Sequence, residues 1–277
     1  MPTPSPTFAA RAAGLLVGLA AGRRLALDGE PDGGLALARI LAEELAAGRR
    51  DLRELAHRWV AHGQADSAAI DSETGAALAH LARHDAPPAR AAGMGSDALV
   101  RSVPVVLAAW SVPATLVSAT YHIVALTHPE PAVAWSAVAV NVALARFLGG
   151  HRDFVPDVIE ALRNNAVPEA LLAAVRRVHL PASAAWHGAA TAVGSPLPEA
   201  IADIEVALRL AYHEPRFERA LEGIALGRAA AARAGLAGAL LGARDGVGVV
   251  PAAWIDSRDR VTFEALAARF APASAPP

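Results

Sequence analysis

Polar residues able to do chemistry occupy short segments between long apolar stretches. Glu30 and Asp32 stand two positions apart in the turn at 28–34. Two carboxylates in one cleft can act as general acid and base, whereas the turn composition also suits a solvated loop. Ser96 and Asp97 form a second polar pair, in which Asp97 can alternatively cap the helix that follows. We interpret Glu30, Asp32 and Asp97 as candidate catalytic groups.

Arginines near expected helix ends form a second candidate set. Arg23 lies late in an apolar helix, while Arg228 and Arg233 flank the alanine run at 229–232. An arginine fork beside a helix N-terminus suits a phosphate or carboxylate ligand, although arginines at helix ends are commonly just solvated. Trp186, in a loop, can flank a planar ligand or simply pack at a rim.

Other kinds of site have little support. The chain has no cysteine, which excludes thiolate catalysis and thiolate metal ligands. His80 and His84 are one helical turn apart, but no third ligand has suitable spacing for zinc. No Gly-x-Ser-x-Gly elbow or Walker loop occurs.

Composition predicts one all-α, orthogonally packed helical domain over 1–277, with flexible tails at 1–7 and 272–277. Apolar residues make up 54% and aromatic residues 5%, a mixture that favours closely packed helices over a β-sandwich. The 25 basic and 27 acidic side chains are dispersed, so nucleic-acid binding is not expected.

The helices that must position these groups are marked by periodicity, caps and prolines. Glycines at 14, 18 and 22 predict close packing of the first helix. Asp51 is an expected N-cap, and either Asp71 or Ser72 is expected to cap the next helix. Prolines near several helix starts cost no hydrogen bond there. Helices are expected at 8–27, about 37–48, after Asp51, after Asp71, and at 131–148, 156–163, 168–178, 198–210 and 215–226.

Two segments imitate membrane signals. The apolar run 12–22 is followed by Arg23 and Arg24 rather than by a small-residue cleavage site. The segment 102–126 is interrupted by Pro104 and Pro113, which favours two buried helices. We therefore expect a cytoplasmic protein without a membrane partner.

Several motifs together resemble the ADP-ribosylglycohydrolase family, including the dinitrogenase reductase-activating glycohydrolases. The segment Gly238-Ala-Leu-Leu-Gly242-Ala, followed by Val249-Val-Pro251-Ala-Ala-Trp254, is similar to the family's last motif. The loop 95–104 is similar to its Gly-Asn-Gly-x-x-Met-Arg-x-x-Pro segment, which lies beside bound ADP-ribose. This resemblance implies ligand-binding roles for Ser96 and Arg101, beside the proposed roles of Arg23, Trp186, Arg228 and Arg233.

The resemblance also implies that a metal site has been lost. The family's Gly-Asp-Thr-Asp-Thr, which holds a pair of magnesium or manganese ions, corresponds to Arg228 and the alanines at 229–232. Its Thr-Asp-Asp-Thr corresponds to Asp32, Gly33, Gly34 and Leu35, and Arg23 replaces a further aspartate. Glu30 falls on a family glutamate. We expect no metal ligands and no cofactor.

Three functions remain open. The first is a pseudoenzyme that binds a nucleotide or ADP-ribose-like small molecule. The second is a metal-independent hydrolase, lyase or cyclase that reuses the cleft, acting on a glycosidic bond if the family chemistry is kept. The third is a conventional magnesium-dependent hydrolase with atypical ligands. The sequence does not define the oligomeric state.

Overall fold

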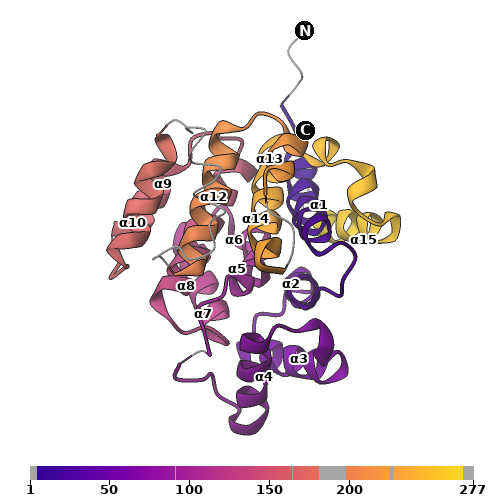
Figure 1. Ribbon diagram of the computed structural model, residues 1–277, viewed down its shortest axis with the longest axis vertical. Coiled ribbons are helices and arrows are strands. Elements are labelled where there is room, and N and C mark those ends of the chain that lie inside the picture. Colours follow the sequence, from indigo (N-terminus) through magenta and orange to yellow (C-terminus); the bar gives the residue numbers. More distant parts are fainter. Residues whose placement is uncertain (1–4, 91, 164, 181–197, 225–227, 271–277) are drawn as a thin grey trace.

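The computed structural model describes residues 5–90, 92–163, 165–180, 198–224 and 228–270. Throughout these ranges the secondary structure is helical, without a strand, which confirms the predicted all-α class. The buried apolar side chains form one core cluster drawn from almost every helix. Figure 1 shows α9 and α10 along one edge, α1 and α15 along the opposite edge, and α3 with α4 at the end of the long axis.

The bounds of the elements follow the chain. The helices are α1 (Phe8–Leu27), α2 (Gly33–Ala46), α3 (Leu52–Ala65), α4 (Ser72–His84), α5 (Asp97–Ser102), α6 (Val105–Ala109), α7 (Pro113–Ala125), α8 (Pro131–Leu148), α9 (Val155–Arg163), α10 (Glu169–Arg176), α12 (Glu199–His213), α13 (Phe217–Glu222), α14 (Arg228–Asp245) and α15 (Ser257–Ala268). Short 3₁₀ turns lie at Ser67–Ala69, Arg177–His179, Val247–Val249 and Ala252–Trp254.

Local signals placed most helix starts correctly. Asp51 and Asp71 cap α3 and α4 by accepting backbone N–H bonds, and proline begins α7 and α8. Thr7, which we expected in a flexible tail, accepts a bond from the Ala10 N–H and caps α1. Residues 1–4 and 272–277 of the expected tails lie outside the described residues.

The packing of α1 against α14 decides where the polar residues meet. The glycines of α1 face small residues of α14 in antiparallel order, with Gly18 opposite Gly238. A Cβ on Gly18 would lie 2.2 Å from the Gly238 carbonyl oxygen, and one on Gly238 would lie 2.1 Å from the Gly18 oxygen. Two helices approach this closely only through glycine backbones. The C-terminal end of α1 is thereby brought against the N-terminal half of α14.

Helix α8 runs through the core and packs against α7, α9, α12 and α14. By length and composition it is the one described helix apolar enough to cross a membrane, yet 72% of its apolar window is buried inside the protein. Burial of this kind is typical of a core helix. The segment 102–126, which we expected to form two buried helices, contains the end of α5 followed by α6 and α7.

Candidate functional site

Three polar segments meet where α1 ends and where α2 and α5 begin. A pocket of about 220 Å³ opens beside this junction. Its lining residues are Arg23, Leu27, Asp71, Ser72, Glu73, Gly95, Ser96, Asp97, His128, Glu199, Ala231 and Ala232. Arg23 comes from α1, Asp97 from α5 and the alanines from α14, so the α1–α14 packing is what assembles this pocket. We call it the Arg23 pocket.

The Arg23 guanidinium joins the two candidate carboxylates. Its Nε and Nη2 donate to Asp32 at 2.6 Å each, and its Nη1 donates to Asp97 Oδ1 at 2.6 Å. Arg23 is only 2% exposed. Asp32 also accepts the Leu35 N–H and thereby caps α2. The planar guanidinium fork suits such bidentate pairing, and a single buried cation therefore sits between two carboxylates.

Glycines make the room that this guanidinium occupies. A Cβ on Gly34 would lie 2.7 Å from Arg23 Nη2 and 3.2 Å from Asp97 Oδ2. On α14, a Cβ on Gly235 would lie 2.5 Å from Arg23 Cγ. Any side chain at position 34 would therefore push against the ion pair. The position of the Arg23 guanidinium therefore depends on the absence of a side chain at Gly34.

The opposite charges of Arg23 and its two carboxylate partners keep these groups ionised. Burial alone lowers the pKa of Arg23, but the charges of Asp97 and Asp32 outweigh it, and the net pKa is raised. Burial alone raises the pKa of Asp97, but the adjacent Arg23 charge outweighs it, so this pKa is lowered. Both groups are therefore charged near neutral pH.

A second buried pair lies next to the first. Ser96 donates to Asp203 Oδ2 at 2.6 Å, and Arg233 Nε donates to Asp203 Oδ1 at 2.8 Å. Arg233 Nη2 lies 2.7 Å from the same oxygen in an ion pair. Burial raises the pKa of Asp203 despite the Arg233 charge. Since Arg23 and Arg233 both pair with carboxylates of the chain itself, neither is the unpaired cation that an anion fork would require.

Arg101 lies in the core rather than on the pocket wall. It is 1% exposed, donates to the hydroxyls of Thr74 and Thr127, and stands 5.7 Å from the ring centre of Trp59. Burial, followed by the charge of Arg101, lowers the pKa of neighbouring His128 to about 3. His128 is consequently neutral at physiological pH. In this geometry Arg101 organises the loop beneath the pocket without reaching it.

Sequence reasoning missed three acidic residues on the pocket wall, Asp71, Glu73 and Glu199. Burial, then the charge of Asp203, raises the pKa of Glu199. Glu73 accepts the Gly95 N–H at 2.9 Å. Asp71 was considered only as an N-cap, and Glu73 and Glu199 stand in the first turns of α4 and α12. No local pattern shows that both helices open toward the same pocket.

The remaining candidates fall elsewhere. Glu30 and Asp32 both line a separate pocket of about 290 Å³ with residues of α15, and Glu30 is not on the wall of the Arg23 pocket. The structure therefore places Glu30 and Asp97 on different cavities. Trp186 lies outside the described residues, as does the side chain of Arg228, although Arg228 begins α14.

Comparison with known proteins identifies the family of the chain. The sequence profile described as ADP-ribosylglycohydrolase matches residues 4–276. The chain belongs to the ADP-ribosylglycohydrolase family. A solved structure titled "ADP-ribosylglycohydrolase-related protein complex" is similar in fold, with a TM-score of 0.73 and 23% identity over 95% of this chain and 97% of that chain. At that identity the likeness shows the ADP-ribosylglycohydrolase fold alone. No curated protein matches the chain.

The two-metal centre implied by the ADP-ribosylglycohydrolase family does not fit the residues of this pocket. Among the described residues, no group of three or more His, Cys, Asp or Glu side chains could hold a metal ion. Asp32 and Asp97 direct their oxygens at Arg23, and α14 contributes the methyl groups of Ala231 and Ala232. Magnesium requires near-octahedral oxygen coordination, and the other described carboxyl groups on the wall do not converge with these two into such a set.

Proposed function

We propose that this member of the ADP-ribosylglycohydrolase family is a metal-independent binding protein whose Arg23 pocket accepts the ribose of an ADP-ribose-like nucleotide. The bridging of Asp32 and Asp97 by Arg23 supports this proposal most directly. A permanent guanidinium occupies the space between carboxylates that would otherwise need a bound cation. The alanines of α14 supply no hydrogen-bonding group in its place.

The pocket wall favours a sugar over a phosphate. Asp71, Glu73, Asp97 and Glu199 bring four carboxyl groups, while Arg23 is the one cationic side chain among its lining residues. An acidic surface repels phosphate, whereas carboxylates accept hydrogen bonds from sugar hydroxyls. The volume of about 220 Å³ lies below that of pockets that enclose drug-sized ligands. One sugar fits inside, and the phosphates and base would extend outward.

Calorimetry tests the proposal. ADP-ribose should bind the chain with the same affinity in EDTA and in millimolar magnesium, because the proposed site uses no metal. Free ribose should compete, and inorganic phosphate should not. Binding that depends on magnesium would contradict metal independence, and the absence of ADP-ribose binding in both buffers would contradict the ligand assignment.

A blocking variant locates the site. Ser72 is exposed and lines the Arg23 pocket, so Ser72→Trp should obstruct its mouth without disturbing the core. Ser67 is also exposed but does not line this pocket, which makes Ser67→Trp the matched control. We expect Ser72→Trp to weaken ADP-ribose binding at least tenfold and Ser67→Trp to leave it unchanged. Equal affinities for the two variants would place the ligand elsewhere.

One observation favours a second function, metal-independent cleavage of a glycosidic bond. The pKa of Glu199 is raised and that of Asp97 is lowered within the same pocket. Two carboxyl groups with divergent pKa values are the usual acid and base of glycosidic hydrolysis. Release of ADP-ribose from an ADP-ribosylated protein in EDTA, lost in both Glu199→Gln and Asp97→Asn, would establish this activity. If the unaltered chain releases no ADP-ribose, the cleavage activity is refuted and only the binding function remains.

A further inference from the structure

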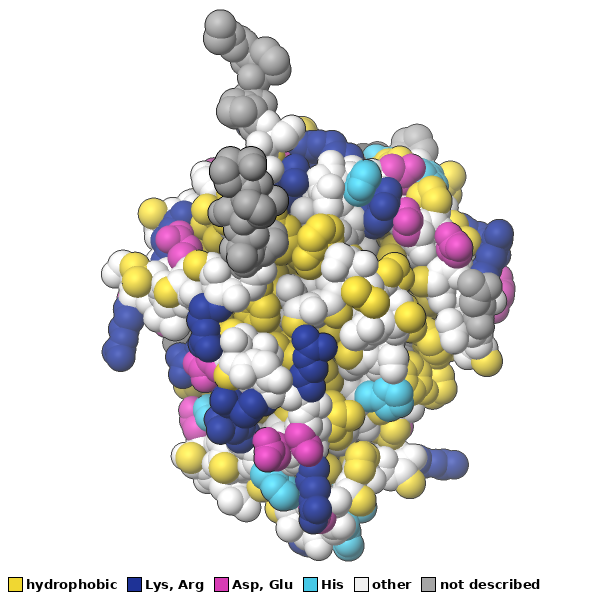
Figure 2. All heavy atoms as spheres, turned by 180° about the vertical axis from the view of Figure 1, so that it is seen from behind, with side chains coloured by type: hydrophobic (Ala, Val, Ile, Leu, Met, Phe, Trp, Pro, Cys, Tyr) yellow, Lys and Arg dark blue, Asp and Glu magenta, His cyan; other side chains and the backbone are white. Residues whose placement is uncertain are grey.

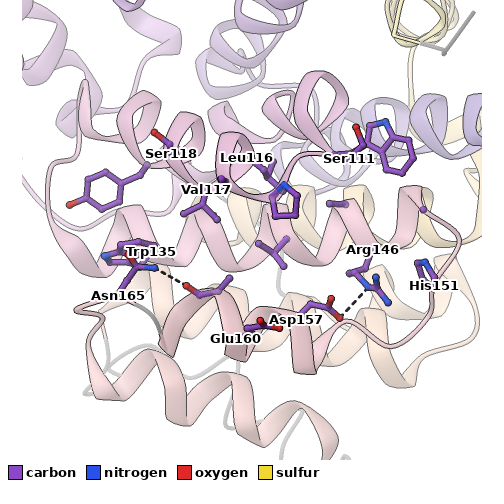
Figure 3. A pocket seen from close by; sticks show the side chains of 18 of the residues that line it. Ser111, Leu116, Val117, Ser118, Trp135, Arg146, His151, Asp157, Glu160 and Asn165 are labelled. Carbon is purple, nitrogen blue, oxygen red and sulfur yellow. Dashed lines mark hydrogen bonds and ion pairs between the residues drawn. The ribbon is translucent and has the colours of Figure 1, made fainter.

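A groove larger than the Arg23 pocket lies among α7, α8 and α9. It has a volume of about 980 Å³, at the upper end of the range for small-molecule sites. Figure 3 shows α8 along its floor, with Leu116 and Val117 of α7 on one side and Asp157 and Glu160 of α9 on the other. We call it the α8 groove. It shares no lining residue with the Arg23 pocket.

The floor and the α7 wall of the α8 groove are largely apolar. Trp135, Val142 and Ala145 repeat along α8 at helical spacing and so share one face. Tyr121 of α7 packs against Trp135 with ring centres 5.1 Å apart and planes tilted by 53°. Trp110, at the C-terminal end of α6, also lines the groove. In Figure 2, hydrophobic side chains gather on the half of the molecule where α7 to α10 lie.

The charges of the groove leave one carboxylate uncompensated. Arg146 Nε stands 3.1 Å from Asp157 Oδ2, so these two charges neutralise each other. Glu160 is exposed and has neither a hydrogen bond nor an ion pair with any residue that the structure describes. The other titratable groups on the wall are Tyr121, His122 and His151. With neutral histidines, the net charge of the lining residues is negative.

We propose that the α8 groove binds an elongated organic cation, with an aromatic or aliphatic body on the α8 floor and an ammonium group near Glu160. Apolar burial supplies affinity along the floor. The Glu160 carboxylate favours a positive charge over a neutral or negative one, and the aromatic rings of Trp135 and Tyr121 that line the same groove are compatible with a cation. The open length of the groove suits a flexible chain rather than a compact ion.

The probes that test this site differ only in charge. Phenylbutylamine, phenylbutanol and phenylbutyrate share one body, and calorimetry at pH 7 compares their affinities. We expect the amine to bind about fivefold more tightly than the alcohol and at least tenfold more tightly than the carboxylate. Equal binding of amine and carboxylate, or no binding of any probe at millimolar concentration, would overturn the proposal.

Variants assign the effect to the groove. Glu160→Gln should remove the preference for the amine while retaining binding of the alcohol, and Trp135→Ala should weaken all three probes. Glu222 is an exposed glutamate on α13 outside the groove, so Glu222→Gln is the matched control and should change nothing. Loss of amine preference in Glu222→Gln would refute the assignment. A dimer in sedimentation that Trp135→Ala dissociates would instead assign the groove to a second copy of the chain.

Discussion

Replacement of Arg23 by methionine tests the central feature of the Arg23 pocket. The change keeps an apolar side chain of similar length but leaves Asp32 and Asp97 without their shared cation. Removing one partner of a buried ion pair costs about 3–5 kcal/mol, because the remaining charge is buried and unpaired. The two carboxylates are 14% and 25% exposed, so water relieves part of this cost and we expect about 3–4 kcal/mol.

This loss of unfolding free energy corresponds to a measurable decrease in Tm. With an unfolding entropy of about 2.1 cal/mol/K per residue, Arg23→Met should lower Tm by about 5–7 °C in differential scanning calorimetry at pH 7. Arg24 is the adjacent arginine and is exposed, so Arg24→Met serves as the matched control and should change stability by less than about 0.5 kcal/mol.

The pH dependence of the same variant separates charge from packing. Since Arg23 lowers the pKa of Asp97 in the folded state, the pair stabilises the protein above the unfolded Asp value of about 3.9. That stability is lost as pH falls through the lower folded value. The gap in Tm between wild type and Arg23→Met should therefore narrow on acidification from pH 7 to pH 3. A gap below 1 °C at pH 7, or one that is constant with pH, would refute the ion-pair account.

Two further predictions concern the surrounding fold. The pKa of His128 is about 3 in the folded protein against about 6.5 when unfolded, so stability is lost as pH falls below 6.5, by about 2 kcal/mol at pH 5. In His128→Asn, the free energy of unfolding from urea titrations should no longer fall by this amount between pH 7 and pH 5. A variant whose free energy of unfolding still falls as much as that of the wild type would contradict this prediction. At the α1–α14 contact, Gly18→Ala should destabilise by about 3 kcal/mol or more, because its Cβ meets the Gly238 backbone. Gly248→Ala, which meets nothing within 4 Å, is the control, and equal melting temperatures for the two variants would exclude close helix contact as the cause.

Much of the fold was predictable because its signals are local. The first helix and the central helix were placed at 8–27 and 131–148, as observed. Asp71 caps α4 through an N–H only three residues away. The family, too, follows from contiguous motifs, and the profile match to residues 4–276 confirms it.

The candidate site was less predictable. From the sequence, Arg23 and Arg233 suggested an anion site, because nothing in the local pattern showed that each arginine pairs with a carboxylate of the chain itself. Arg23 pairs with Asp97 across 74 positions, and Arg233 with Asp203 across 30. Glu199 was not singled out, because only the path of α12 brings it to the wall of the Arg23 pocket.

Most of the helices, several of their caps and the family could be read from the sequence alone. Only the tertiary structure decided that Arg23 stands between Asp32 and Asp97, and that Gly34 provides its space. The physical reason is one of range. Caps and periodicity act within one or two helical turns. The carboxylates that surround a buried cation are instead brought together by helix packing, here the glycine contact between α1 and α14.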